Sequence, residues 1–385
     1  MRNVGLVLRG GGARAAYQVG ALHALAEIFG TRTCPFRVLS GLSAGAINCL
    51  AVGVGADDFP QAVERLRETW MSLTPESVYR TDFPKLASLG LRWIKDLGTG
   101  GALGRSRANH LLDTQPLREL LTRTLDVTRL PGHFETGVLR GVAISATNYL
   151  TGSTVSFFDG EPSLEPWARR RRISLREGIG IEHVMASAAI PLFFPPVELD
   201  GKFYGDGGVR MTTPISPAIH LGAEKILAIG IRYQRPADST LEMNREIRAE
   251  SVTVSEIAGV LLNAVFLDSL DNDIERLERI NRTLGFVAAA DRRKLPDLLR
   301  PIPCLALRPS QDLGRLAVGQ YDKFPPMLRY LLRGIGVSGE AGWDLMSYLA
   351  FQPEYVGALI ELGRADTLAR RREIEAFFET DTEDR

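Results

Sequence analysis

The sequence predicts an α/β protein with a mainly parallel sheet, because its first 56 residues alternate between strand and helix patterns. Residues 4–8 form a short apolar run bounded by turn residues, which is typical of a buried parallel strand. Apolar residues then recur at helical spacing from 13 to 22. A second strand pattern over 36–40 is followed by a closely packed helix pattern from 44. This strand–helix–strand–helix order is how a parallel α/β sheet begins.

Three consecutive glycines join the first predicted strand to the first predicted helix. Gly10, Gly11 and Gly12 are followed by Ala13 and Arg14. Free N–H groups at a glycine-rich helix start stabilise an anion, either a phosphate or the oxyanion of a tetrahedral intermediate. The loop lacks the G-x-G-x-x-G spacing of dinucleotide sites and the Lys-Ser/Thr of a P-loop. Nucleotide binding is therefore the weaker of the two interpretations.

The second strand-to-helix junction carries a serine between glycines. Gly41 precedes Ser43 by two residues and Gly45 follows it by two. This spacing is typical of a nucleophile elbow, in which the Oγ projects from the sheet edge over a helix N-terminus. Glycines are needed there because side chains would clash as the turn doubles back. The alternative is an inert helix N-cap serine.

A third motif follows a predicted hairpin. Residues 197–204 alternate around Asp200-Gly201, a typical hairpin turn, and lead into Asp206, Gly207 and Gly208. An aspartate followed by two glycines lies in a loop that another backbone can approach closely. The alternative is a surface Asx turn.

Together with the run from Ala186 to Pro196, these three motifs resemble the patatin-like phospholipase family. The four segments occur in the family's order, and the resemblance covers residues 3–235. Residues 255–375 resemble the C-terminal part of bacterial members more weakly. One departure is Ala15, where many relatives have a glycine after the arginine. Alanine is small enough to continue a helix, so we expect no loss of the oxyanion function.

The resemblance implies a patatin-like three-layer α/β/α core and a Ser–Asp dyad. Ser43 would be the nucleophile and Asp206 the general base, acting through an acyl-enzyme that water hydrolyses. The remaining site residues are implied in supporting roles: the oxyanion hole of Gly10, Gly11, Gly12 and Arg14, and the elbow and loop glycines Gly41, Gly45, Gly207 and Gly208. The implied substrates are acyl esters of phospholipids or related lipids, cleaved as by a phospholipase A or lysophospholipase. An esterase or thioesterase of soluble substrates and a catalytically silent lipid-binding scaffold remain alternatives.

A histidine base would change the mechanism to a triad. Of the five histidines only His220 follows Asp206, which would give the order Ser, Asp, His of ordinary α/β-hydrolases. Its surroundings predict a short helix leading into a strand over 225–229. We therefore expect His220 to lie on a helix surface, outside the site.

Composition excludes several other classes. The 385 residues contain 46 Lys and Arg against 46 Asp and Glu, so no net field attracts nucleic acid, and no nucleic-acid partner is expected. Cys34, Cys49 and Cys304 fit neither a disulfide framework nor a zinc pattern, which predicts a reducing compartment and no metal. No cofactor is expected either. No signal-peptide pattern and no bilayer-spanning apolar run of ~20 residues occur. We expect a cytoplasmic protein whose membrane contact, if any, is peripheral and on the inner face.

The sequence divides into three parts. A catalytic core over 1–235 is followed by residues 236–320, with one long amphipathic helix over 255–282 and a strand over 302–307. Residues 321–385 are a helical C-terminal extension that ends in an acidic tail. Scattered apolar residues between 85 and 107 predict either a packed helix or a lipid-facing lid. We expect the C-terminal helices to pack on the core; whether they form an acyl-chain groove or a homo-oligomer face stays open.

Overall fold

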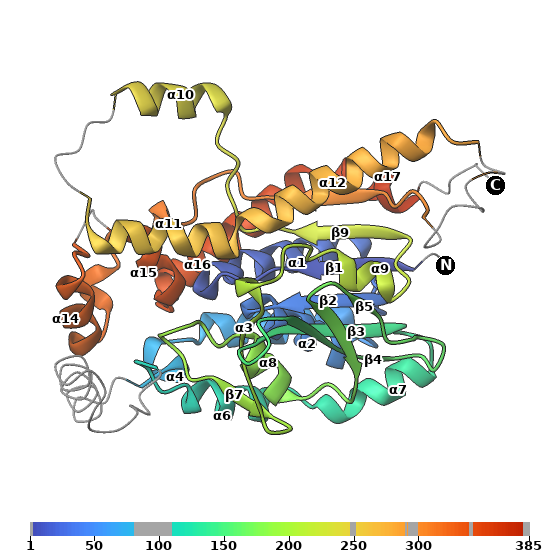
Figure 1. The fold of residues 1–385 in the computed structure, drawn as a ribbon, viewed down its shortest axis with the longest axis horizontal. Coiled ribbons are helices and arrows are strands. Elements are labelled where there is room, and N and C mark those ends of the chain that lie inside the picture. Colours follow the sequence, from blue (N-terminus) through green and yellow to red (C-terminus); the bar gives the residue numbers. More distant parts are fainter. Residues whose placement is uncertain are drawn as a thin grey trace.

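The computed structural model describes residues 3–80, 110–246, 252–288, 299–338 and 342–379, together with Asp291. Its centre is one sheet of ten strands, ordered β10-β9-β1-β2-β3-β4-β6-β5, with β8 pairing β3 and β7 pairing β8 (Figure 1). The strands are β1 (Val4–Leu8), β2 (Val38–Leu42), β3 (Gly141–Asn148), β4 (Thr154–Gly160), β5 (Ala168–Arg169), β6 (Arg172–Arg176), β7 (Val197–Leu199), β8 (Lys202–Asp206), β9 (Lys225–Ile229) and β10 (Cys304–Leu307).

The five strands from β10 to β3 are parallel, and β4 and β8 run antiparallel to β3. A parallel sheet is normally covered on both faces, and its strands are then apolar at every position. β1 illustrates this, since Leu6 and Leu8 pack into one core cluster and Val7 into the other. The predicted α/β class with a mainly parallel sheet is confirmed.

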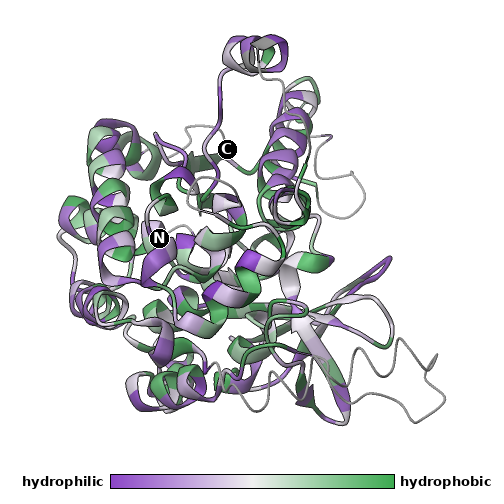
Figure 2. Cartoon of the chain, turned by 90° about the vertical axis from the view of Figure 1, so that its left-hand side faces the viewer, coloured by the Kyte–Doolittle hydropathy of each residue, from purple (hydrophilic) through white to green (hydrophobic). Residues whose placement is uncertain are grey.

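Helices cover both faces of the sheet and complete three layers. One face carries α1, α2, α3 and α16, with α16 packed along α1, and the other carries α9 and α12. The peripheral helices carry hydrophilic and hydrophobic residues in alternation along their turns (Figure 2). The helices are α1 (Ala16–Phe29), α2 (Ala44–Val54), α3 (Phe59–Met71), α4 (Pro75–Val78), α6 (Gln115–Thr124), α7 (Leu130–Glu135), α8 (Ile181–Ser187), α9 (Ser216–His220), α10 (Ala237–Glu246), α11 (Val254–Phe266), α12 (Asp268–Gly285), α14 (Pro326–Gly334), α15 (Trp343–Leu349), α16 (Pro353–Ala369) and α17 (Arg371–Glu379).

The long helix predicted over 255–282 is wrong in one respect, because it is two helices, α11 and α12, that meet at Leu267. The physical reason is a tertiary contact. The Arg9 guanidinium donates to the Val265 carbonyl at 2.6 Å and to the Ser269 hydroxyl. In a continuous helix that carbonyl would accept from the N–H four residues later. Apolar spacing continues through the junction, so the sequence pattern does not reveal it.

The predicted hairpin before Asp206 can be compared with the structure, whereas two other expectations cannot. The predicted hairpin over 197–204 forms as β7 and β8, with Asp200 and Gly201 at positive φ in its turn. The stretch 85–107 lies outside the described residues, and the boundaries at 235 and 320 stay predictions. Within the described part of the chain, no helix is both long and apolar enough to cross a bilayer.

Candidate active site

Ser43 occupies the turn between β2 and α2 in a strained conformation. Its φ of 54° and ψ of −135° lie in a region that residues with a side chain rarely adopt. The Ser43 N–H donates to Ser187 Oγ at 2.9 Å, and that hydroxyl donates to the Ser145 carbonyl at 2.6 Å. This chain of hydrogen bonds links the turn to β3 and α8, so the fold around the turn maintains the strain.

Glycines around Ser43 permit the close backbone contacts of the turn. A Cβ on Gly45 would lie 2.3 Å from the Leu8 carbonyl oxygen, and one on Gly41 would lie 2.7 Å from the Ala46 Cα. A Cβ on Gly10 would lie 2.2 Å from the Ser43 Cβ. These distances are too short for any side chain, so the first glycine of the triple loop lies directly against the serine turn. The carboxyl ends of β1 and β2 therefore bring both predicted loops together, as parallel sheets commonly do.

Asp206 ends β8 and faces the serine. Its Oδ2 accepts a 2.5 Å hydrogen bond from Ser43 Oγ, and its Oδ1 accepts from the Gly208 N–H at 2.8 Å. Its backbone is also held, since its N–H donates to the Ala189 carbonyl and its carbonyl accepts from the Thr147 hydroxyl. Asp206 is fully buried. Both oxygens of the carboxyl are thus fixed, one of them on the serine hydroxyl.

The two glycines after Asp206 pack against neighbouring segments. A Cβ on Gly207 would lie 2.2 Å from the Ser145 carbonyl oxygen, and one on Gly208 would lie 2.5 Å from the Phe266 ring. The loop therefore packs closely between β3, which Gly207 contacts, and α11, which Gly208 contacts.

Burial raises the pKa of Asp206 to about 7, against the opposing effects of the hydrogen bonds from Ser43 and Gly208 and of the Arg9 charge. A carboxylate with a pKa near 7 is a much better base for a hydroxyl than one at its ordinary value of about 3.9. Arg9 is itself buried, and burial lowers the pKa of its guanidinium to about 10. Sequence reasoning missed Arg9; the available signal was a charged residue between an apolar strand and three glycines.

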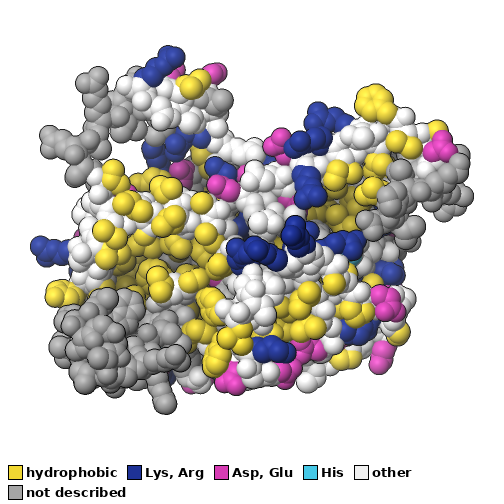
Figure 3. All heavy atoms as spheres, viewed as in Figure 1, with side chains coloured by type: hydrophobic (Ala, Val, Ile, Leu, Met, Phe, Trp, Pro, Cys, Tyr) yellow, Lys and Arg dark blue, Asp and Glu magenta, His cyan; other side chains and the backbone are white. Residues whose placement is uncertain are grey.

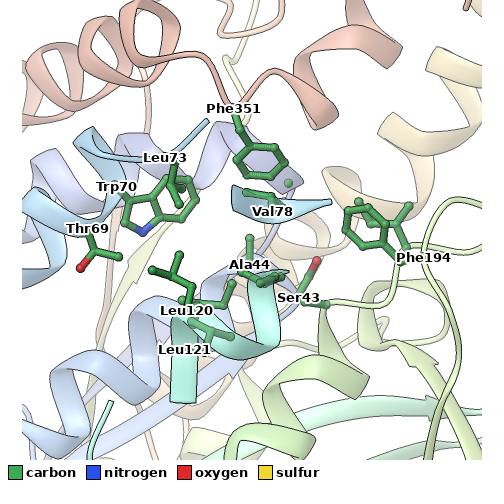
Figure 4. Close-up of a pocket in the computed structure, with 15 residues that line it drawn as sticks. Ser43, Ala44, Thr69, Trp70, Leu73, Val78, Leu120, Leu121, Phe194 and Phe351 are labelled. Atoms are coloured by element: carbon green, nitrogen blue, oxygen red, sulfur yellow. The ribbon is translucent and has the colours of Figure 1, made fainter. Parts of the chain in front are cut away.

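An apolar cavity opens beside the Ser43 hydroxyl, and its empty volume, counted together with the open solvent at its mouth, is about 510 Å³. Figure 4 shows the hydroxyl directed into the space enclosed by Phe194, Phe351 and Val78. Apart from Ser43, Thr69 is the one lining residue with a hydroxyl, and no charged residue is among the described residues that line the cavity. The lining residues are Gly12, Ser43, Ala44, Ile47, Thr69, Trp70, Leu73, Val78, Leu117, Leu120, Leu121, Ala188, Ile190, Phe194 and Phe351.

The triple-glycine loop has different neighbours at each residue. Gly12 has φ of +57° and lines the Ser43 cavity, and a Cβ there would lie 2.1 Å from the Tyr348 carbonyl oxygen. A Cβ on Gly11 would lie 2.1 Å from the Ile231 side chain. Gly10 and Gly12 therefore require glycine because a Cβ would meet backbone atoms, whereas at Gly11 the close atom is the end of the Ile231 side chain; Gly10 packs on the serine and Gly12 lines the same cavity.

Arg14 turns toward the C-terminal helices instead. Its guanidinium forms a 2.8 Å ion pair with Asp344, donates to Ser347 Oγ at 2.8 Å and lies over the Tyr348 ring. It borders a second, polar cavity and is not among the residues that line the Ser43 cavity. Its position fixes the start of the first helix against α15, and its predicted contribution to an oxyanion field stays a prediction.

A buried polar network holds the glycine loop from behind. Gln18 donates to the carbonyls of Arg9 and Ile229 and accepts from Asn48 at 3.0 Å. Asn48 in turn accepts from the Trp70 indole N–H at 2.9 Å, and the Trp70 ring lines the cavity. Sequence reasoning missed this network, because isolated polar residues on predicted helices give no signal of a shared partner.

The histidine alternative finds no support in the arrangement of the site. None of the chain's five histidines, all of which the structure describes, lines the Ser43 cavity. His220 lies on α9 and stacks on Trp167, with ring centroids 4.8 Å apart and planes 8° apart. Its ring thus has a packing role, as expected for a histidine on a helix surface.

Serine hydrolases with an α/β fold typically have a strained serine at a strand-to-helix turn. Here that serine is hydrogen-bonded to a buried carboxyl and lies beside an apolar cavity. A model of the patatin-like phospholipase family matches residues 6–219. The chain therefore belongs to the patatin-like phospholipase family, as its motifs predict.

Several known proteins are similar to this chain. Probable lipid hydrolase 463L of Invertebrate iridescent virus 6 is 24% identical over 217 residues, which cover 56% of this chain and 62% of the viral protein. Human GIVD cytosolic phospholipase A2 gives a TM-score of 0.45 at 13% identity, covering 98% of this chain and 60% of that chain. VipD from Legionella pneumophila gives a TM-score of 0.36 at 14% sequence identity, and the match covers 97% of this chain and 67% of VipD. The chain thus spans less than two thirds of the viral protein and of the human enzyme.

Proposed function

We propose that the protein is a serine-dependent lipid acyl hydrolase of the phospholipase A or lysophospholipase type. The observation that carries this proposal is the 2.5 Å hydrogen bond from Ser43 Oγ to the buried Asp206 carboxyl, at one wall of an apolar cavity. The serine supplies the nucleophile, the carboxyl the base, and the cavity a site for an acyl chain. Family membership supports a lipid ester as the substrate.

The proposed reaction has two halves. Ser43 Oγ attacks the ester carbonyl carbon while Asp206 takes the hydroxyl proton, and main-chain N–H groups of the Gly10–Gly12 loop stabilise the oxyanion. Collapse of the tetrahedral intermediate breaks the ester bond, and the proton passes from Asp206 to the departing alcohol. Water then attacks the acyl-enzyme, Asp206 takes its proton, and release of the fatty acid returns that proton to Ser43.

Two alternatives remain beside the lipid substrate. The proposed acyl-chain site would serve any leaving group, so an esterase or thioesterase of soluble substrates would use the same residues. A catalytically silent lipid-binding scaffold would not need a strained serine hydrogen-bonded to a carboxyl. Backbone strain costs of order 1–3 kcal/mol and persists mainly at functional sites. The second alternative is therefore the weaker one.

The test combines covalent labelling with a comparison of substrates. We expect a fluorophosphonate probe to label the native protein at Ser43, as located by peptide mass spectrometry. We also expect micellar phospholipid to be hydrolysed faster than a short-chain p-nitrophenyl ester at equal concentration. Preference for the soluble ester would favour the esterase alternative. A native protein that is neither labelled nor active would favour the scaffold.

The pH dependence of hydrolysis is the next prediction. Asp206 acts as a base only when ionised, and burial raises its pKa to about 7. We therefore expect kcat/KM to be low at pH 5, to rise through about pH 7 and to reach a plateau above it. Initial rates with a p-nitrophenyl ester, corrected for the ionisation of p-nitrophenol, measure this profile. A profile that is flat between about pH 5 and 8 would contradict the raised pKa of Asp206.

Gly10→Ala is expected to lower activity about a hundredfold through a steric effect at the nucleophile. The new methyl group would need the space of the Ser43 Cβ, 2.2 Å away, so the serine turn or the glycine loop must shift. A shift of about 1 Å at reacting groups costs about a hundredfold in rate. Ester hydrolysis and thermal unfolding would be measured together. Gly178→Ala is the matched control, since a Cβ there meets no atom within 4 Å, and it should keep wild-type activity.

A further inference from the structure

The helix α11 is apolar on two opposite faces. Its inner face carries Phe266, which is buried, while Val254, Ile257, Val260 and Leu261 on its outer face are 52–65% exposed. The outer positions follow helical spacing and form one stripe. Figure 3 shows hydrophobic side chains gathered over α11, on the left of the view. Below, this stripe is called the outer face of α11.

The inner face of α11 contacts the segments that carry the site. Phe266 packs on Gly208, two residues after Asp206, and the Val265 carbonyl accepts from Arg9. Asn263 accepts from the Tyr348 hydroxyl at 2.9 Å. The outer face is therefore one helix diameter away from the loop that holds the proposed base.

The neighbouring helix α12 shows that an apolar outer surface is not general in this region. Its exposed side chains are all polar or charged: Asn272, Glu275, Arg276, Glu278, Arg279, Arg282 and Thr283. Glu256, the charged residue of α11, is exposed one turn before Val260, at the edge of the stripe, and accepts from the Thr253 N–H at 2.7 Å as part of the helix cap. The outer face thus offers a partner apolar contact without charge or hydrogen bonding.

We propose that the outer face of α11 is the surface by which the protein docks on lipid aggregates, with its aliphatic side chains inserted among the acyl chains. The proposal rests on the lipid hydrolase function proposed above, because the substrates of such an enzyme present an apolar layer. The four side chains of the stripe carry no group that donates or accepts a hydrogen bond, which suits a helix face buried among acyl chains. Docking through α11 places the catalytic loops next to the layer that supplies the substrate.

The first test measures binding separately from catalysis. Ser43→Ala protein, which leaves the lipid intact, would be cosedimented with phosphatidylcholine vesicles at about 0.15 M and about 0.5 M NaCl. We expect binding at both salt concentrations, because uncharged contacts are not screened. Adding Ile257→Gln and Leu261→Gln should weaken binding about tenfold or more, since two aliphatic side chains lose apolar burial. Phe286→Gln is the matched control, because Phe286 is 92% exposed beyond the opposite end of α12, and it should leave binding unchanged.

The second test uses the active protein and separates the two proposals. Ile257→Gln with Leu261→Gln should hydrolyse a soluble p-nitrophenyl ester at the wild-type rate while losing about tenfold or more on vesicles. Vesicle binding that depends on α11 in a protein without hydrolytic activity would support docking and contradict the hydrolase. Absence of vesicle binding, binding unaffected by the double substitution, or binding lost at the higher salt concentration would each overturn the docking proposal. A dimer that the double substitution dissociates, with vesicle binding unchanged, would overturn it in favour of a second copy of the chain.

Discussion

Replacing Ser43 by alanine is expected to reduce ester hydrolysis by roughly 10⁴- to 10⁶-fold and to abolish fluorophosphonate labelling, by analogy with other serine hydrolases. The change removes the oxygen that would form the acyl-enzyme, and no other described residue of the cavity replaces it. Thr69 is the other hydroxyl-bearing residue of the lining, and its Oγ1 donates to the Arg65 carbonyl without contact to Asp206. Initial rates measure the loss of hydrolysis, probe labelling measures the loss of the nucleophile, and circular dichroism checks that the purified variant is folded.

Two control variants test whether another hydroxyl or a histidine takes part in the reaction. Thr69→Ala removes the other hydroxyl of the cavity and should keep most of the activity. His220→Ala removes the histidine that would complete a triad in sequence order, and its ring stacks on Trp167 away from the cavity lining. Near-normal activity of both variants would leave Ser43 as the nucleophile of a dyad. An inactive, folded His220→Ala protein would instead require a triad.

The parts of the site that the sequence predicts are those with local steric causes. Gly41, Ser43 and Gly45 reveal a turn because a tight strand-to-helix junction excludes side chains at fixed positions. The structure bears this out in the contacts that a Cβ on Gly45 would make with Leu8. The same holds for the hairpin that leads to Asp206, whose turn residues are recognisable in the sequence alone.

The parts that the sequence does not reveal depend on contacts between distant segments. Arg9 meets Val265 and Ser269, which lie 256 and 260 positions later, and this contact marks the break between α11 and α12. Ser187 fixes the serine turn through a hydroxyl that looks like any other in a helix. Cavity-lining leucines on α6 follow the same apolar spacing as leucines in an ordinary core, so periodicity cannot distinguish a binding site from packing.

Asp206→Asn is expected to lower kcat by roughly 10²- to 10⁴-fold, the usual contribution of a general base. The amide has the shape of the carboxyl and an oxygen that can still accept from Gly208, but it takes up no proton. Asp200→Asn is the matched control, because it makes the same chemical change at an exposed hairpin turn, and asparagine tolerates the positive φ found there. That variant should remain fully active.

The same substitution should change how stability depends on pH. Burial raises the pKa of Asp206 from 3.8 in the unfolded chain to about 7 in the folded protein, so the folded state holds a proton that the unfolded state releases. The free energy of unfolding contributed by this group therefore falls as the pH rises from about 4 to about 7, and it is constant beyond. The amide introduced by Asp206→Asn does not titrate and has no such dependence. Urea unfolding at about pH 4 and about pH 8 should show the variant gaining stability relative to wild type at the higher pH, by a few kcal/mol.

Loss of activity together with this gain in stability would show that the ionised Asp206 carboxylate destabilises the folded protein and is nevertheless needed for catalysis. Simple damage to the fold would lower activity and stability together at every pH. An inactive variant whose stability relative to wild type is the same at both pH values would show that burial does not raise the pKa of Asp206. In that case the general base would act at its ordinary pKa, and the acid limb of the activity profile should lie near about pH 4 instead of near about pH 7.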